Sequence, residues 1–265
     1  MTRSTGSQPS LSQGSNIDMK SIPETRARQA ALARPADTDD ESALAPRIDR
    51  RQNILDASQR LFARLGYHAV TIRQIAEEAH VPLALVGYYF GQKQELYDAI
   101  FGHWSGIVRE RLTDIQAALE PVGGDRLARI VDALVLPSAR LRETPEGRSY
   151  ALLVTRGLSQ QGQEEDRAIR EFFDPLAREF INAMHEVLLV EWPDATRVQT
   201  AWCYQFALGA LLHHLSDQRI ERLSGGVAVP SDPSVANQLS AFIACGIRGA
   251  MASFARKAAE QATGA

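Results

Sequence analysis

The stretch TIRQIAEEAHVPLALVGYYFGQKQELYDAI, residues 71–100, decides the fold because it holds two short helical patterns separated by a tight break. Thr71, with a glutamine three residues later, predicts a capping box in which each side chain satisfies a free backbone N–H. Pro82 cannot continue the first helix, although proline is favoured in the first turn of a new one. The resulting pair of helices, over about 71–80 and 82–90, is typical of a helix-turn-helix.

Helical spacing of apolar residues continues on both sides of this stretch. One helix is predicted over about 47–65, where Gly66 takes the position that ends a helix, and another over about 92–120. No strand pattern and no internal repeat is visible along the chain. The sequence therefore predicts an all-α protein, with an N-terminal three-helix helix-turn-helix domain and a larger helical domain. The remaining helices are expected over about 125–141, 146–159, 166–189 with Pro175 as a candidate kink, 194–223 capped by Asp194, and 233–262.

The bulk composition is that of an ordinary globular protein, with 265 residues, 45% hydrophobic residues and a net charge of −3. Because the whole chain is not a polycation, a nucleic-acid partner would have to be held by a local basic patch. Cys203 and Cys245 match no metal or redox spacing, and no phosphate loop, nucleophile elbow or zinc motif occurs. We therefore expect no catalytic residue, no metal site and no cofactor, which leaves an enzyme as the weaker alternative.

Residues 1–45 differ from the rest because they contain no aromatic residue and are rich in Ser, Gly, Gln, Thr and Ala. Such a segment cannot bury enough apolar surface to offset its ordering entropy, so we predict a disordered tail. No run approaches the roughly 18 apolar residues of a membrane span, and the N-terminus lacks the apolar core of a signal peptide. We therefore expect a cytoplasmic protein without a membrane partner.

The segment 47–100 carries a distinctive set of residues, namely Phe62, Gly66, Tyr67, Thr71, Ile75, Ala76, Val81, Tyr89, Phe90, Lys93 and Leu96. With this set it resembles the DNA-binding domain of the TetR family of transcriptional regulators. The resemblance implies a ligand-responsive repressor that binds a palindromic operator in double-stranded DNA as a homodimer and is released by a small molecule. It also implies three parts: a tail (1–45), a helix-turn-helix domain (46–92), and a helical effector-binding and dimerisation domain (93–265).

The resemblance implies DNA contacts from the second and third helices and from the start of the fourth. Thr71 would reach a phosphate, and Arg73 would approach a base or a phosphate. Lys93 would pair with a phosphate at a helix N-terminus, where the helix dipole favours negative charge. The exposed face of the third helix would lie in the major groove. The expected DNA-binding residues are Thr71, Arg73, Leu83, Ala84, Leu85, Gly87, Tyr88, Tyr89 and Lys93.

The third helix departs from the family pattern. Many family members have a polar residue where this chain has Leu83, and Tyr where it has Gly87. Few side chains are left to hydrogen-bond base edges, so thymine methyl groups and DNA shape would supply more of the specificity. Two alternatives stay open: Tyr88 stacks on the first helix instead of meeting DNA, or the protein is a helical scaffold whose helix-turn-helix no longer reads DNA.

The resemblance further implies a small lipophilic effector held among the middle helices. Aromatic and methionine side chains suit an apolar cavity. The last two long helices, with Phe206 and Phe242, are expected to form the dimer interface, the alternative being a core within one chain. The expected effector-binding residues are Trp104, Ile107, Phe173, Phe180, Met184, Trp202 and Phe206.

Overall fold

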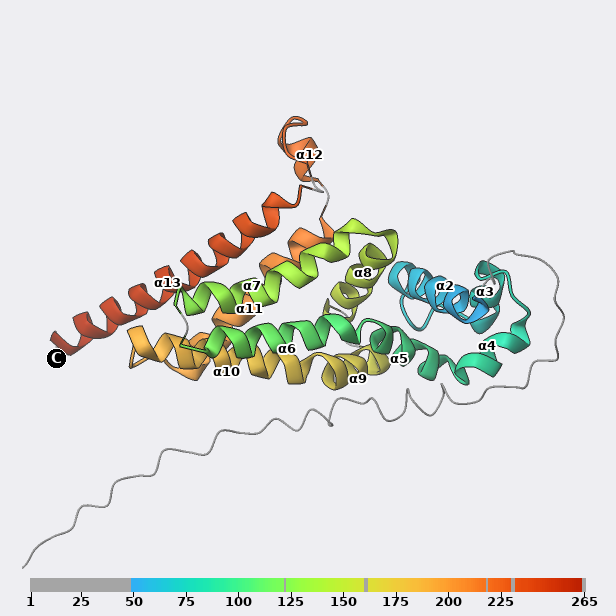
Figure 1. The fold of residues 1–265 in the computed structure, drawn as a ribbon, viewed down its shortest axis with the longest axis horizontal. Helices are drawn as coiled ribbons and strands as arrows, with labels where there is room; N and C mark the ends of the chain where they lie inside the picture. The colour runs from blue at the N-terminus through green and yellow to red at the C-terminus, as the bar shows by residue number, and fades with distance from the viewer. Residues whose placement is uncertain (1–48, 122, 160–161, 218, 230–231, 264–265) are drawn as a thin grey trace, which may run out of the picture. The chain divides into compact units, whose positions relative to one another are not determined.

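The computed structural model describes residues 49–121, 123–159, 162–217, 219–229 and 232–263. This part of the chain is all-helical, with 12 α-helices, one 3-10 helix and no strand, which confirms the predicted fold class (Figure 1). The predicted tail, 1–45, lies outside the described residues. The helices are α2 (Arg50–Leu65), α3 (Ile72–Glu78), α4 (Leu83–Phe90), α5 (Lys93–His103), α6 (Ser105–Leu119), α7 (Arg126–Ala139), η1 (Arg140–Glu143), α8 (Pro145–Ser159), α9 (Gln163–Phe172), α10 (Asp174–Glu191), α11 (Arg197–Ser216), α12 (Ile220–Leu223) and α13 (Ser234–Thr263).

Side-chain caps start the first two helices. Asp49 Oδ1 accepts hydrogen bonds from the backbone N–H groups of Arg51 and Gln52, at 3.0 and 3.2 Å, and so begins α2. The predicted capping box is confirmed: the Thr71 backbone N–H donates to Gln74 Oε1 at 2.8 Å, and the Gln74 N–H donates to Thr71 Oγ1 at 3.3 Å. Local sequence therefore fixes where these helices begin.

The turn between α3 and α4 depends on His80, which has a φ of 54°. Its N–H donates to the Glu77 carbonyl at 3.1 Å, and the Val81 N–H donates to the Ala76 carbonyl at 3.0 Å. This pair of bonds is a Schellman motif, which usually places glycine where His80 stands. The left-handed conformation costs a residue with a Cβ roughly 1–2 kcal/mol. The sequence analysis predicted the break from Pro82 and did not predict a left-handed residue at position 80.

The prediction of one continuous helix over 92–120 is wrong. The segment forms two helices, α5 and α6, which are separated at Trp104, whose φ and ψ are −88° and 6°. Gly102 and Gly106 flank the break and lower the helix propensity of this stretch. The Trp104 indole is also held by contacts from other helices, described below, so tertiary packing overrides the apolar periodicity.

Two further predicted helices need correction. Residues 166–189 belong to α9 and α10, and Pro175 lies in the first turn of α10 instead of kinking a longer helix. The helix predicted over 194–223 is capped by Thr196, not Asp194, in a capping box with Gln199. It ends at Ser216, and the short α12 follows.

The helices after α5 pack around one another and onto α2. Helix α10 lies beside α6, and α13 lies beside α7, as Figure 1 shows. Helix α8 packs against both α2 and α11, so it connects the helix-turn-helix with the rest of the described chain. None of the described helices combines the length and apolar character that a membrane crossing requires.

Candidate DNA-binding surface and effector cavity

Helix α4 separates into a buried and an exposed side. Val86 and Phe90 are buried, as expected for core positions. Leu83 and Tyr88 are exposed to 47% and 63%, and Ala84 and Gly87 are exposed as well. A Cβ added at Gly87 would have no atom within 4 Å, so this position faces open space. The exposed side of α4 is free to enter a DNA groove, which is wide enough for one helix.

The other expected DNA contacts differ in how free they are. Arg73 is exposed, and it makes no ion pair with any residue in the described ranges. Leu85 and Tyr89 are half-buried against the core. The Tyr88 ring lies edge-on to the Tyr89 ring, with centroids 5.2 Å apart. Arg73 and Tyr88 are therefore the groups best placed to reach outward.

Lys93 is folded back onto its own domain. Its Nζ lies 4.2 Å from the centroid of the Tyr67 ring, a cation–π contact. Burial lowers the pKa of Lys93, and the nearby carboxylates of Glu164 and Glu165 oppose that shift. A phosphate contact by Lys93 would require the side chain to leave this ring.

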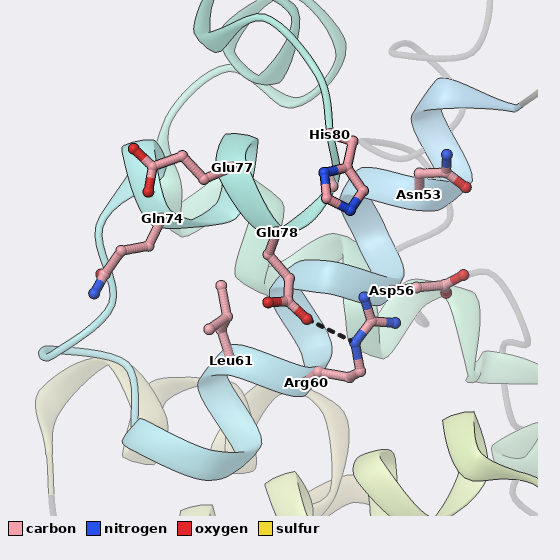
Figure 2. A pocket seen from close by; sticks show the side chains of 9 residues that line it. Asn53, Asp56, Arg60, Leu61, Gln74, Glu77, Glu78 and His80 are labelled. Carbon is pink, nitrogen blue, oxygen red and sulfur yellow. Dashed lines mark hydrogen bonds and ion pairs between the residues drawn. The ribbon is translucent and has the colours of Figure 1, made fainter.

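A groove of about 690 Å³ opens between α2 and α3, and its character is acidic (Figure 2). Asp56, Glu77 and Glu78 contribute carboxylates to its lining. Arg60 is the one arginine or lysine among the nine lining residues, and its Nε lies 3.3 Å from Glu78 Oε1. Because these carboxylates would repel phosphates, the groove marks a wall of the domain that is unsuited to DNA.

A largely enclosed cavity of about 190 Å³ lies among α6, α7, α8, α10 and α11. Ile107, Phe173 and Phe180, three of the seven expected effector-binding residues, line it. The wall is mostly apolar, with Arg111 and Tyr204 among the polar groups that face it. This combination is typical of a small-molecule site.

The other four expected effector-binding residues lie outside the lining of this cavity. Met184 is buried elsewhere in the core, and Trp104 lies at the junction of α5 and α6. Trp202 and Phe206 are exposed to 58% and 68%, with their rings stacked 5.7 Å apart. Helical periodicity correctly indicates that Trp202 and Phe206 share one face of α11, but this face is exposed and does not line the cavity.

An exposed apolar face runs along α11 and α13, defined by Val198, Trp202, Phe206 and Phe242. Each of the four side chains is more than half exposed. On α13, Gly246 and Gly249 lie at helical spacing from Phe242 and are also exposed. An isolated chain rarely leaves such a patch uncovered.

Trp104 connects the cavity with the DNA-binding end. Its ring stacks on Tyr150, a cavity-lining residue, with centroids 4.8 Å apart and an interplanar angle of 13°. Its indole N–H donates to Gln59 Oε1 on α2 at 2.7 Å. Gln59 is buried, and its Nε2 donates to the Glu146 carbonyl on α8 at 2.7 Å. The sequence missed this connection because its members lie far apart in the chain.

A second bridge joins the loop after α2 to the start of α9. The Tyr67 N–H donates to Glu165 Oε1 at 3.2 Å, and His68 Nε2 lies 3.2 Å from Glu164 Oε2. One ligand atom from each of His68, Glu164 and Glu165 lies within 4.8 Å of the others. No sequence motif indicates this juxtaposition, because His68 and the two glutamates are almost a hundred residues apart.

Two family models match the chain. Residues 54–100 match the model described as "Bacterial regulatory proteins, tetR family", and residues 132–246 match "Tetracyclin repressor-like, C-terminal domain". The first covers α3 and α4 entirely, and the second covers most of the cavity wall.

Curated relatives and solved structures agree with this assignment. The HTH-type transcriptional regulator BetI of Brucella anthropi is 30% identical over 140 residues, which are 52% of this chain and 69% of that protein. BetI of Brucella suis is 37% identical over 84 residues, 31% of this chain, and the match spans only 41% of the relative. A putative TetR-family transcriptional regulator from Rhodococcus sp. superimposes with a TM-score of 0.51 at 15% identity, covering 77% of this chain and 99% of that one.

The Clostridium perfringens putative fatty acid metabolism regulator also shares the fold, with a TM-score of 0.51 at 18% identity over 74% of this chain and 96% of that one. At this identity the likeness concerns the fold alone. The helix-turn-helix geometry, the two matching models and the BetI relative lead to one conclusion: the chain belongs to the TetR family of DNA-binding transcriptional regulators, which are not enzymes.

Proposed function

We propose that this regulator is a repressor that binds a palindromic operator as a homodimer and is released by a small lipophilic effector bound in the cavity. The observation that carries the proposal is the chain of contacts from Tyr150 in the cavity wall, through Trp104, to Gln59 inside α2. A ligand that moves Tyr150 would change the support of α2. A cytoplasmic location accords with operator DNA as the partner.

The DNA contacts in this proposal come from the exposed side of α4 and from the N-terminus of α3. Leu83, Ala84 and Gly87 would lie in the major groove, where apolar groups contact thymine methyls. Thr71, Arg73, Lys93 and the two tyrosines would meet the phosphates, which supply most of the affinity. Leu85, half-buried, would support the helix from behind.

Dimerisation in this proposal uses the exposed apolar face of α11 and α13. Two copies related by a two-fold axis would each cover the face of the other, as an isologous interface requires. The exposed Gly246 and Gly249 would allow close approach of the helices. Trp202 and Phe206 then belong to the dimer interface and not to the effector site.

The release step follows from linkage. An effector lowers operator affinity only if it binds better to the conformer whose two DNA-binding domains do not fit the operator. A coupling of about 1–3 kcal/mol would change operator affinity roughly 5- to 150-fold. The break between α5 and α6 at Trp104 is the proposed lever, because it connects the cavity with α2.

The experiment has two stages. Genome-wide mapping of DNA bound by the full chain yields operator sites, and a reporter at a mapped promoter should rise when the regulator is removed. Trp104→Phe keeps the stack on Tyr150 but loses the donor to Gln59. This variant should bind the operator nearly as well as wild type and release it less on adding effector, in a gel shift. A reporter that falls without the regulator contradicts repression, and unchanged release by Trp104→Phe contradicts the lever.

A further inference from the structure

Arg111 on α6 places a positive charge in the wall of an otherwise mostly apolar cavity. We infer that the effector is a small amphipathic acid, whose carboxylate pairs with Arg111 while its apolar part fills the cavity. The inference rests on the proposed function, because it takes this cavity as the effector site.

Within the described ranges, Arg111 is poorly satisfied. Its one hydrogen bond to these residues runs from a terminal nitrogen to the Leu134 carbonyl, at 3.3 Å. Its Nε is buried and has no hydrogen-bond partner. No carboxylate of the described residues lies within 4.0 Å of its guanidinium nitrogens. A buried polar group without a partner loses hydration that nothing in the protein replaces.

Arg126 and Arg129 also have a buried Nε without a hydrogen-bond partner among the described residues, but their terminal nitrogens are better satisfied than those of Arg111. Arg126 pairs with Glu186 at 3.1 Å and also donates to the Leu119 carbonyl at 2.9 Å. Arg129 donates to three backbone carbonyls, at 3.0 to 3.2 Å. Among the described residues, Arg111 has a single carbonyl partner and no acidic one, so its charge is available to pair with a ligand.

The charged and titratable groups around Arg111 do not neutralise it. Glu110 is paired with Arg140, and Asp174, which also lines the cavity, lies 3.9 Å from Arg178 on its own helix. Burial raises the pKa of Tyr150, and it raises that of Tyr204 to about 12, so both phenols are neutral near pH 7. Burial lowers the pKa of Arg111, but a guanidinium stays charged at this pH.

The same surroundings define the ligand. A guanidinium fork binds a carboxylate through two parallel N–H···O bonds, and neutral phenols can donate further hydrogen bonds. The cavity of about 190 Å³ is smaller than the roughly 300–1,000 Å³ typical of ligand pockets, which favours a short acid. Tyr150 both lines the cavity and stacks on Trp104, so an acid bound at Arg111 would act on the proposed lever.

Matched pairs of acid and alcohol test the inference on the full chain. Octanoate is compared with 1-octanol, and phenylacetate with 2-phenylethanol, by thermal shift and by release of a mapped operator in a gel shift. At least one acid should bind about tenfold or more tightly than its alcohol, the fold-change expected for a hydrogen-bonded charge pair. Arg111→Met should abolish that preference, whereas Arg109→Met, which alters an exposed arginine of the same helix, should keep it.

The outcomes separate the inference from the proposed function. If acid and alcohol bind equally well, or if Arg111→Met still prefers the acid, the anionic effector is wrong while the cavity stands as the effector site. If none of the four compounds shifts the melting temperature, the cavity loses its proposed role and the inference fails with it. Arg111→Met should melt no lower than wild type, because an apolar side chain replaces an unpaired charge. If it fails to fold, Arg111→Lys takes its place, and an undiminished acid preference there would contradict bidentate pairing.

Discussion

The DNA-binding end and the cavity end of this protein are specified in different ways. In α2–α4, the decisive contacts join residues a few positions apart, such as the box between Thr71 and Gln74 or the bonds around His80. At the cavity, the decisive contacts join distant residues, such as Trp104 with Gln59 and with Tyr150. The structure of α2–α4 can therefore be predicted from local sequence signals, whereas the structure around the cavity depends on how distant helices pack.

The largest expected effect concerns the exposed apolar face of α11. Trp202→Glu combined with Phe206→Glu should convert the dimer to a monomer, because two aromatic anchors are lost from the interface at about 2 kcal/mol or more each. Both side chains are exposed, so each chain should stay folded. Light scattering gives the mass, and a gel shift should show that operator affinity falls with the dimer.

Val190→Glu is the matched control for that pair. Val190 is a 74% exposed apolar residue on α10, outside the apolar face. Its replacement should leave the mass and the operator affinity unchanged. A wild-type protein that already has the mass of one chain at micromolar concentration would remove the basis for the comparison.

The next effect tests how tightly the cavity end is packed. Gly147, buried near the start of α8, would place an added Cβ 2.3 Å from the Leu141 carbonyl oxygen. The backbone of η1 would have to move, so Gly147→Ala should lower the free energy of unfolding by about 1–3 kcal/mol. Urea denaturation followed by circular dichroism measures this change in the free energy of unfolding. An unchanged midpoint would mean that η1 and α8 can move apart at little cost in free energy.

A smaller effect distinguishes the two sides of the DNA-binding end. Arg73→Ala removes an exposed charge that has no ion-pair partner in the described part of the chain, and it should weaken operator binding. For each DNA-binding domain, the slope of log K against log salt should become less steep by about 0.9. Glu77→Ala, in the wall of the acidic groove, should leave the slope unchanged or strengthen binding slightly. Fluorescence anisotropy across a salt series gives both slopes, and an identical slope for wild type and Arg73→Ala would exclude a phosphate contact.

The smallest effect is a gain in stability. Gly87 lies within α4 and has open space around the position of a Cβ. Gly87→Ala should raise the free energy of unfolding by roughly 0.5–1 kcal/mol, because alanine loses less backbone entropy in a helix. Thermal unfolding compares this variant with Gly147→Ala. The opposite signs expected for one substitution in two helices express the difference between the open surface of α4 and the packed cavity end.

Much of the architecture could be predicted from sequence. The capping box, the Gly66 end of α2 and the break at Pro82 are local effects, and they gave the helix-turn-helix correctly. The longer helices were harder. Apolar periodicity continues through Trp104 and Phe173, yet the backbone breaks at both places. Periodicity records which face of a helix is apolar, and it does not record where a neighbouring helix forces the chain to turn.

The candidate sites divide in the same way. The segment 71–93 by itself predicts which residues share the exposed face that we propose meets DNA, because neighbours in a short helix share a face whatever packs behind them. Only the tertiary structure decided that Ile107, Phe173 and Phe180 line a cavity, that Trp202 lies outside it, and that Arg111 has no acidic partner there. The physical reason is that helical spacing fixes the direction of a side chain, whereas burial, cavities and unpaired charges depend on which distant helix packs against it.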